Sequence, residues 1–128
     1  MTWHRQAAAD ALVTVLGAAN PGVQIHDSPP NTLNPMCVVV MRPQVVSYAV
    51  AAFSVDEATL PVAIVGGTES EDLIDAIRDA CRKAVDADPT LGGAVASAVC
   101  EQERNWRNVT GAGGVQLLYV ELVLLVRM

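Results

Sequence analysis

The most regular pattern of apolar and polar positions in this chain lies between residues 69 and 88. Apolar side chains recur there at steps of three and four, and charged side chains fill most other positions, as in a helix with one buried face. Thr68 followed by Glu71 forms a capping box, so the helix is predicted to begin at Glu69 and to end before Asp88-Pro89. Its predicted core face consists of Leu73, Ile77, Ala80, Cys81, Ala84 and Val85.

Shorter patterns precede this helix. A first helix is expected from a cap at Thr2 to about Gly17, because small and aliphatic residues recur along one side of it. Alternating or β-branched stretches, separated by proline and glycine, are typical of strands. They predict strands at 23–26, 37–41, 45–53 and 60–65.

After the second helix the chain is predicted to form a long hairpin. Residues 94–108 and 115–128 flank the segment Thr110–Gly114, which has the glycine content of a hairpin connection. The last strand is apolar on both faces except at Gln116 and Glu121, so we place it centrally in the sheet or at a subunit contact. It is too short and too interrupted to span a bilayer, and no membrane partner is predicted.

The order of these elements predicts one α+β domain over residues 1–128. We expect a mostly antiparallel sheet of about five or six strands with two helices packed on one face. A length of 128 residues suits one domain. The chain is 52% hydrophobic but only 4% aromatic, so its interior is aliphatic and its apolar surface exceeds what a monomer needs to bury. That excess indicates a homo-oligomer.

Charge and cysteine content narrow the possible partners. The net charge is −6 and the eight basic residues are scattered, which argues against sequence-specific DNA binding. Cys37, Cys81 and Cys100 lie far apart within regular elements, a distribution typical of buried, reduced thiols in a cytoplasm.

Residues suited to catalysis or metal binding are sparse. The chain has two histidines, and neither stands at a ligand spacing from a cysteine. His26-Asp27 with Cys37 resembles a Cys-His pair only superficially, so a structural role is favoured. Gly66-Gly67-Thr68 lacks the lysine of a P-loop, and the acidic residues after it would repel phosphate. We therefore predict no enzymatic activity, no catalytic or metal-binding residue and no cofactor.

Trp106, between Arg104 and Arg107, is the best candidate for an interaction hot spot. The alternative, a peripheral aromatic that only covers the hairpin, stays open. The proline-rich loop 28–35 is stiff enough to be presented to a partner at low entropic cost, although it would serve equally as a connector. The predicted interface comprises Pro29, Pro30, Asn31, Asn34, Asp56, Glu57, Arg104, Trp106 and Arg107.

The acidic face of the second helix carries Asp72, Asp75 and Asp79. Such a face is most often ordinary solvated surface. In a ring-shaped assembly these residues could instead line a channel, and we retain that possibility as a hypothesis.

Several phrases resemble the tail terminator proteins of long-tailed, siphovirus-type bacteriophages. They are ADALVTVLGAANPGVQIHD, the loop SPPNTLNP leading into CVVV, EDLIDAIRDACRKAVDADPTLGGAV, and the closing LYVELVLLV. The likeness lies in the order, spacing and total length of these phrases, which span almost the whole chain. None of them is a catalytic signature.

The resemblance implies a structural virion protein at the neck of the tail, assembled in the host cytoplasm. Such a subunit forms a hexameric ring on the major tail tube protein, stops tube polymerisation and joins the tail to a head-tail connector or stopper protein. Double-stranded DNA passes through the ring without sequence-specific binding, and like-charge repulsion from an acidic lining would keep it from adhering. The alternatives are another neck subunit, such as a stopper or tail-completion protein, and a small ligand-binding α+β domain.

Overall fold

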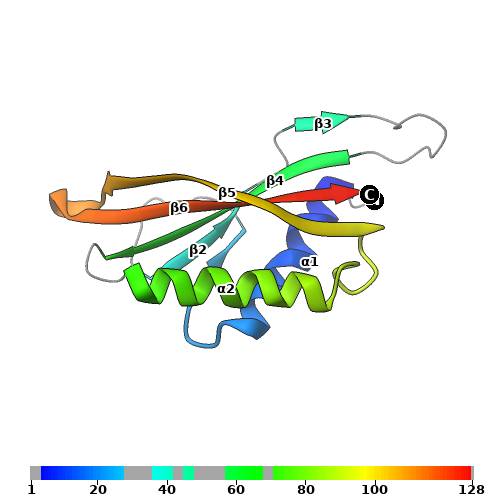
Figure 1. Cartoon of the computed structure of the whole chain (residues 1–128), viewed down its shortest axis with the longest axis horizontal. Helices are drawn as coiled ribbons and strands as arrows, with labels where there is room; N and C mark the ends of the chain where they lie inside the picture. Colours follow the sequence, from blue (N-terminus) through cyan, green and yellow to red (C-terminus); the bar gives the residue numbers. More distant parts are fainter. Residues whose placement is uncertain (1–3, 28–35, 42–44, 48–56, 68–70, 128) are drawn as a thin grey trace.

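The computed structural model describes residues 4–27, 36–41, 45–47, 57–67 and 71–127. These residues form a sheet with two helices on one of its faces (Figure 1), which confirms the predicted α+β class. The elements are α1 (His4–Ala19), β1 (Gln24–His26), β2 (Cys37–Val40), β3 (Val45–Ser47), β4 (Glu57–Gly67), α2 (Glu71–Ala87), β5 (Ser97–Thr110), a 3-10 turn (Ala112–Gly114) and β6 (Gln116–Arg127).

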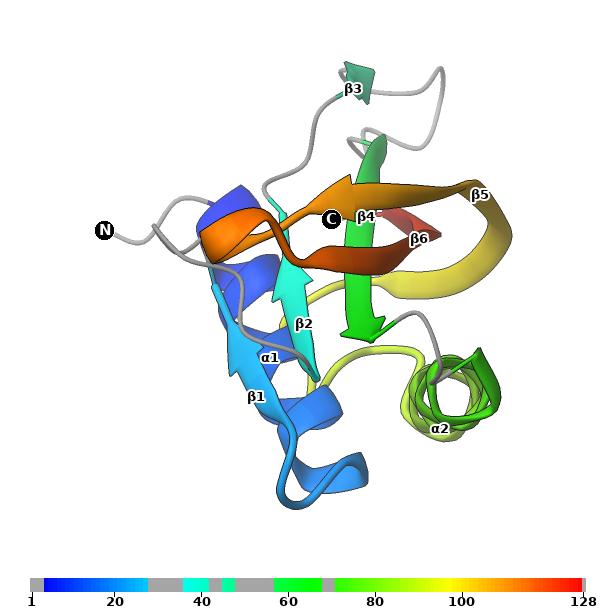
Figure 2. The same cartoon turned by 90° about the vertical axis from the view of Figure 1, so that its left-hand side faces the viewer.

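The sheet has the strand order β1-β2-β4-β6-β5, and β3 pairs with the beginning of β4. Only the β1–β2 pair is parallel, and the other pairs are antiparallel. The strand β6 lies between β4 and β5, which confirms its predicted central place. Each helix covers a different part of the sheet, because α1 packs against β1 and β2 while α2 packs against β4 and β5 (Figure 2).

Strand β4 is longer than predicted and contains Pro61, which ordinarily disfavours a central strand. The Pro61 carbonyl accepts a hydrogen bond from the Met41 amide at 3.0 Å, so the edge of β4 at this residue faces the segment after β2. On that edge β2 pairs with β4 only as far as Val62, and β3 begins to pair at Thr59. Pro61, which lacks an N–H, therefore lies between the stretch of β4 that pairs with β2 and the stretch that pairs with β3. The pairing of β4 with β6 on its other edge is not interrupted.

Burial on α2 corrects the predicted core face. Ile74 is fully buried, whereas Leu73 is 58% exposed. The buried positions are Ile74, Ile77, Cys81 and Val85, so three predicted positions are confirmed and Ile74 takes the place of Leu73. The predicted Ala80 and Ala84 are half-buried. The predicted cap at Thr68 and start at Glu69 lie outside the described residues, and the described helix begins at Glu71.

The first helix continues two residues beyond the predicted end, and Asn20 follows it. Asn20 is only 6% exposed, and its side-chain amide donates to the Leu16 carbonyl at 2.9 Å and to the Cys81 thiol at 3.5 Å. This residue satisfies a terminal carbonyl of α1 and links that helix end to α2. Apolar residues of both helices then meet the sheet in one core.

The three cysteines are free. Burial raises the pKa of Cys81 to about 11 and that of Cys100 to about 11, and it also raises the pKa of Cys37. The thiols therefore stay protonated near neutral pH, as expected for packing groups. Neither described helix has the length and apolar character needed to cross a membrane.

Candidate assembly surface around the β5–β6 hairpin

Four segments meet at one end of the molecule, which we name the hairpin end (Figure 1). They are the start of β2 at Cys37, the end of β4 at Gly67, the first turn of α2, and the turn Ala112–Gly114 between β5 and β6. Register places Cys37 opposite Val65 and Gly67 opposite Leu117. Segments far apart in the sequence thus lie near one another at this end of the molecule.

Strand β5 is at the edge of the described sheet and carries two irregularities in its pairing with β6. One lies between Cys100 and Gln102, and the other lies between Arg104 and Arg107. Within the second, Asn105 has a φ of 61°, a left-handed conformation that asparagine adopts more readily than most residues. The second irregularity is therefore a bulge that leaves Asn105 and Trp106 unpaired and bends the strand.

The side chain of Glu121, on the neighbouring strand β6, binds two residues at this bulge. It is only 6% exposed, and its carboxylate accepts a hydrogen bond of 2.7 Å from the Asn105 side-chain amide. The Arg104 Nε lies 3.6 Å from the same carboxylate and, within the described ranges, has no hydrogen-bond partner although it is buried. The sequence predicts Glu121 within the last strand but does not reveal its partners, because they depend on the register of the bulge.

Arg107 is the first residue of β5 after the bulge that pairs with β6 again, opposite Tyr119. Its guanidinium lies over the Tyr119 ring, 4.8 Å from the centroid, a favourable cation–π arrangement. Burial raises the pKa of Tyr119, and the nearby Glu121 acts in the same direction. The phenol is therefore neutral at physiological pH.

Trp106 lies in the bulge and is 40% exposed. Two further large apolar side chains are exposed at the hairpin end, Leu73 at 58% and Val115 at 57%. Trp106 is thus not a core residue, and both sequence-based interpretations of it remain open. Exposed large apolar side chains and arginines are typical components of an interaction surface.

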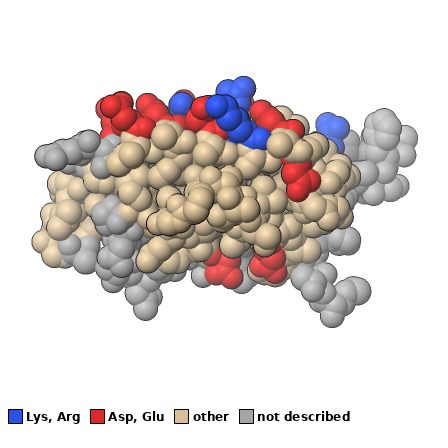
Figure 3. Space-filling model, turned by 90° about the horizontal axis from the view of Figure 1, so that it is seen from below, with Lys and Arg blue, Asp and Glu red and all other residues tan. Residues whose placement is uncertain are grey.

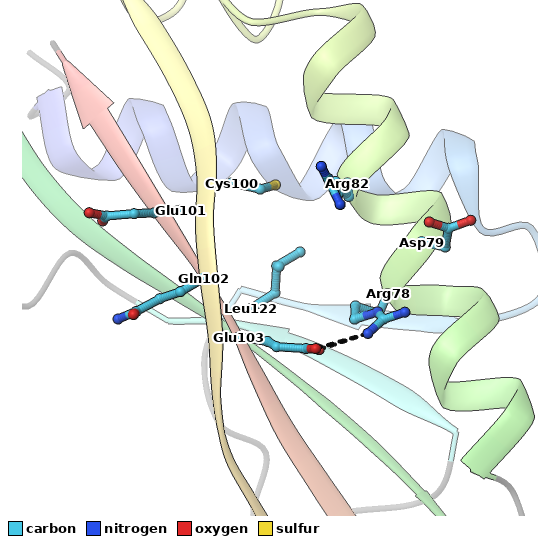
Figure 4. A pocket seen from close by; sticks show the side chains of 8 residues that line it. All are labelled: Arg78, Asp79, Arg82, Cys100, Glu101, Gln102, Glu103 and Leu122. Atoms are coloured by element: carbon cyan, nitrogen blue, oxygen red, sulfur yellow. Dashed lines mark hydrogen bonds and ion pairs between the residues drawn. The ribbon is translucent and has the colours of Figure 1, made fainter.

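A groove of about 300 Å³ separates α2 from β5. Within it Arg78 of α2 donates to both carboxylate oxygens of Glu103, at 3.0 and 2.9 Å (Figure 4). This hydrogen bond with Glu103 raises the pKa of Arg78. The groove is lined by Arg78, Asp79, Arg82, Cys100, Glu101, Gln102, Glu103 and Leu122.

The predicted acidic face of α2 is partly neutralised within the chain. Asp79 pairs with Lys83 at 3.1 Å, and Asp75 lies 3.8 Å from Arg78. Asp72 is exposed, and no ion pair to it is found among the described residues. Figure 3 shows acidic and basic side chains mingled along the edge that α2 forms. The channel-lining role of Asp72, Asp75 and Asp79 stays a prediction.

The predicted interface residues do not all come together. Arg104, Trp106 and Arg107 share the bulge, whereas Glu57 begins β4 at the opposite end of the sheet, where its carboxylate accepts from Arg127 at 3.2 Å. Outside the described residues lie Pro29, Pro30, Asn31, Asn34 and Asp56.

In the part of the chain that the structure describes, no three His, Cys, Asp or Glu side chains gather where they could hold a metal ion. His26 and Cys37 lie on neighbouring strands, but Cys37 pairs with Gln24 and His26 pairs with Val39. The pairing separates the two residues along the strands, so the register gives no support to a Cys-His pair.

Comparison with known proteins finds no family model and no curated protein that matches this chain. Among solved structures, the chain is similar to one described as "Virion of native gene transfer agent (GTA) particle", with a TM-score of 0.45 and 15% sequence identity. The likeness covers 95% of this chain and 92% of that chain. A similarity at this level of identity and TM-score is too distant to assign a family or a function.

Proposed function

We propose that this protein is a structural virion protein of a phage-like particle, and specifically a tail terminator. In this role a ring of copies binds the last ring of the tail tube, stops further addition of tube subunits and offers its other face to a head-side connector. Termination of this kind needs no bond to be made or broken, because the ring only has to occupy the surface that the next tube subunit would use. We therefore propose a non-enzymatic role.

The observation that carries the proposal is that three large apolar side chains, Leu73, Trp106 and Val115, are 58%, 40% and 57% exposed. Each side chain belongs to a different segment, and the bulge at Asn105 fixes the backbone that carries Trp106. Large apolar groups that stay exposed in a single subunit favour burial against another protein. The resemblance in element order and phrase spacing then favours the tail terminator among assembling proteins.

The first test measures mass by light scattering on the purified protein, alone and with the tail tube subunit of the same genome. A hexamer, or a monomer that forms rings on the tube protein, supports the proposal. A monomer that ignores the tube protein would favour the ligand-binding alternative. Gene order gives a second check, because a terminator gene is expected just upstream of the genes for the tube and tape-measure proteins.

Replacing Trp106 by alanine is expected to weaken assembly by about 2 kcal/mol, a roughly thirtyfold change in the association constant, if the side chain is a hot spot. The free energy of unfolding of the monomer should change little, since the side chain is 40% exposed. Sedimentation across a dilution series measures the first quantity, and urea unfolding measures the second. Unchanged association would reduce Trp106 to a peripheral aromatic.

Neutralising Asp72, Asp75 and Asp79 together with asparagine tests the channel hypothesis. We expect the helix to fold, because Asp72 and Asp79 are exposed and the ion pairs of Asp75 and Asp79 are surface pairs, each worth at most about 1 kcal/mol. If the face lines the channel, ring assembly or DNA passage should change. Normal infectivity of phage that carry the triple variant would refute this placement.

A further inference from the structure

The groove between α2 and β5 contains one arginine that has no ion pair among the described residues. Arg78 is held by both oxygens of Glu103, whereas Arg82, one turn further along α2, forms no hydrogen bond or ion pair with any described residue. Asp79 is paired with Lys83 at 3.1 Å. Figure 4 shows Arg82 directed toward Cys100 and Glu101 directed away from α2. The groove thus offers a free guanidinium.

The groove is lined mostly by polar side chains, and one part of it is apolar. Leu122 and Cys100 contribute an apolar base between the two arginines and the strand. A volume of about 300 Å³ is at the lower end of the range for ligand pockets, so it accommodates one or two side chains. An occupant that places a leucine-sized side chain over Leu122 and a carboxylate on Arg82 would match these two parts of the lining.

The first turn of α2 has this composition. Leu73 is 58% exposed, and the preceding Glu71 and Asp72 are exposed acidic residues for which no ion pair or hydrogen bond is found within the described residues. Acidic residues at a helix start are favoured by the helix dipole on their own account. The dipole gives no reason for an exposed leucine beside them, so this turn combines both features that the groove requires.

One molecule cannot bring the two surfaces together. Leu73 and Arg82 belong to the same helix, and nine residues at 1.5 Å per residue separate them by about 14 Å. A rigid helix keeps that separation, so the contact has to form between two copies. Two different patches that recognise each other repeat from subunit to subunit and close into a ring when the rotation permits.

We propose that the first turn of α2, Glu71 to Leu73, docks into the Arg82 groove of a neighbouring copy of this chain, with Leu73 over Leu122 and an acidic side chain on Arg82. The proposal rests on the proposed function, because it names the subunit contact of the ring. In this contact the beginning of α2 is the segment that docks, and the part of α2 around Arg82 belongs to the groove that receives it.

The test compares two charge reversals on adjacent residues of α2. Arg82→Glu places a carboxylate in the groove, and we expect the concentration for half-assembly to rise about tenfold, as for a contact weakened by one charge pair. Lys83→Glu is the matched control, since it makes the same change at a residue paired with Asp79 and absent from the groove lining. It should change that concentration far less. Analytical ultracentrifugation of each variant over a dilution series measures it.

Two further variants test the docking turn, Glu71 to Leu73. Combining Arg82→Glu with Asp72→Arg restores opposite charges across the contact and should recover most of the lost assembly. Leu73→Ala should weaken assembly without loss of thermal stability, since alanine is the better helix former. Val99→Ala, at another exposed apolar position outside the contact, is its control. Circular dichroism confirms the fold of each variant.

The possible outcomes distinguish failure of the proposed contact from failure of the proposed ring. If the unaltered protein assembles and Arg82→Glu assembles as well as Lys83→Glu, the contact is wrong while the ring stands. A charge-exchanged variant that assembles no better than Arg82→Glu would also overturn the contact. If the unaltered protein stays monomeric alone and with tube protein, the ring and the contact both fail.

Discussion

Replacing Ile74 by alanine is expected to lower the free energy of unfolding by about 3 to 4 kcal/mol, as for a fully buried aliphatic side chain that leaves a cavity. Ile74 is 0% exposed and belongs to the core shared by both helices and the sheet. Its packing is close: a Cβ placed on Gly66 would come within 2.9 Å of the Ile74 Cδ1 and Cγ1 atoms. A side chain at position 66 would therefore clash with Ile74, so the glycine at this position of β4 leaves the space that the Ile74 side chain fills.

Leu73→Ala is the matched control, since it removes a side chain of the same size one position away. Leu73 is 58% exposed, so its loss should change the free energy of unfolding by about 0.5 kcal/mol or less. Urea unfolding followed by circular dichroism measures both variants. Equal losses at the two positions would mean that the helix is rotated from the orientation described above.

Replacing Glu121 by alanine is expected to cost about 3 kcal/mol. The change removes the acceptor of the Asn105 amide and the ion-pair partner of Arg104, and removal of one partner of a buried polar group is costly. The Arg104 side chain is 36% exposed, which keeps the loss below that of a fully buried ion pair. Because the bulge then lacks its anchor, we also expect Trp106 to lose its fixed position and assembly to weaken.

Asn105→Gly separates the hydrogen bond from the backbone shape. Glycine accepts the φ of 61° at this position, so only the side-chain contact to Glu121 is lost, and we expect a destabilisation of about 1 kcal/mol. Asn105→Val, in contrast, strains the left-handed backbone and should cost more. A Glu121→Ala variant as stable as Asn105→Gly would show that Arg104 does not depend on this carboxylate.

Local patterns predicted the element types well and the contacts between elements poorly. Periodicity identified α2, but Leu73 and Ile74 are adjacent apolar residues, and no local rule decides which of them faces the core. Tertiary packing decides it, since Gly66 lies opposite Ile74. The extent of β4 was underestimated at both ends. Residues 57–59 pair with β3, and Gly66 and Gly67 pair with β6, and these pairings depend on segments that are remote in the sequence.

The candidate surface was predictable in composition but not in geometry. A tryptophan between two arginines near a glycine-rich turn drew attention to Trp106, and the structure exposes it. Its bulge arises from a register shift between β5 and β6, which the alternation of single residues does not specify. Asn105 carried a usable signal, because asparagine is enriched in left-handed backbone positions. The groove that contains Arg82 is lined by residues of α2, β5 and β6. No pattern within one of these segments predicts that the three lie together.

The two irregularities in β5 have a consequence for how a free subunit survives before it finds its partners. As the outer strand of the described sheet, β5 presents unpaired backbone groups that a strand from any other molecule could extend into a growing aggregate. The shifts between Cys100 and Gln102 and between Arg104 and Arg107 divide this edge into short segments that no straight strand can follow. Charged side chains along the same strand oppose such stacking further. We expect these features to oppose the addition of a foreign strand at this edge, so the irregularities that shape the candidate surface also protect the free subunit from nonspecific strand pairing.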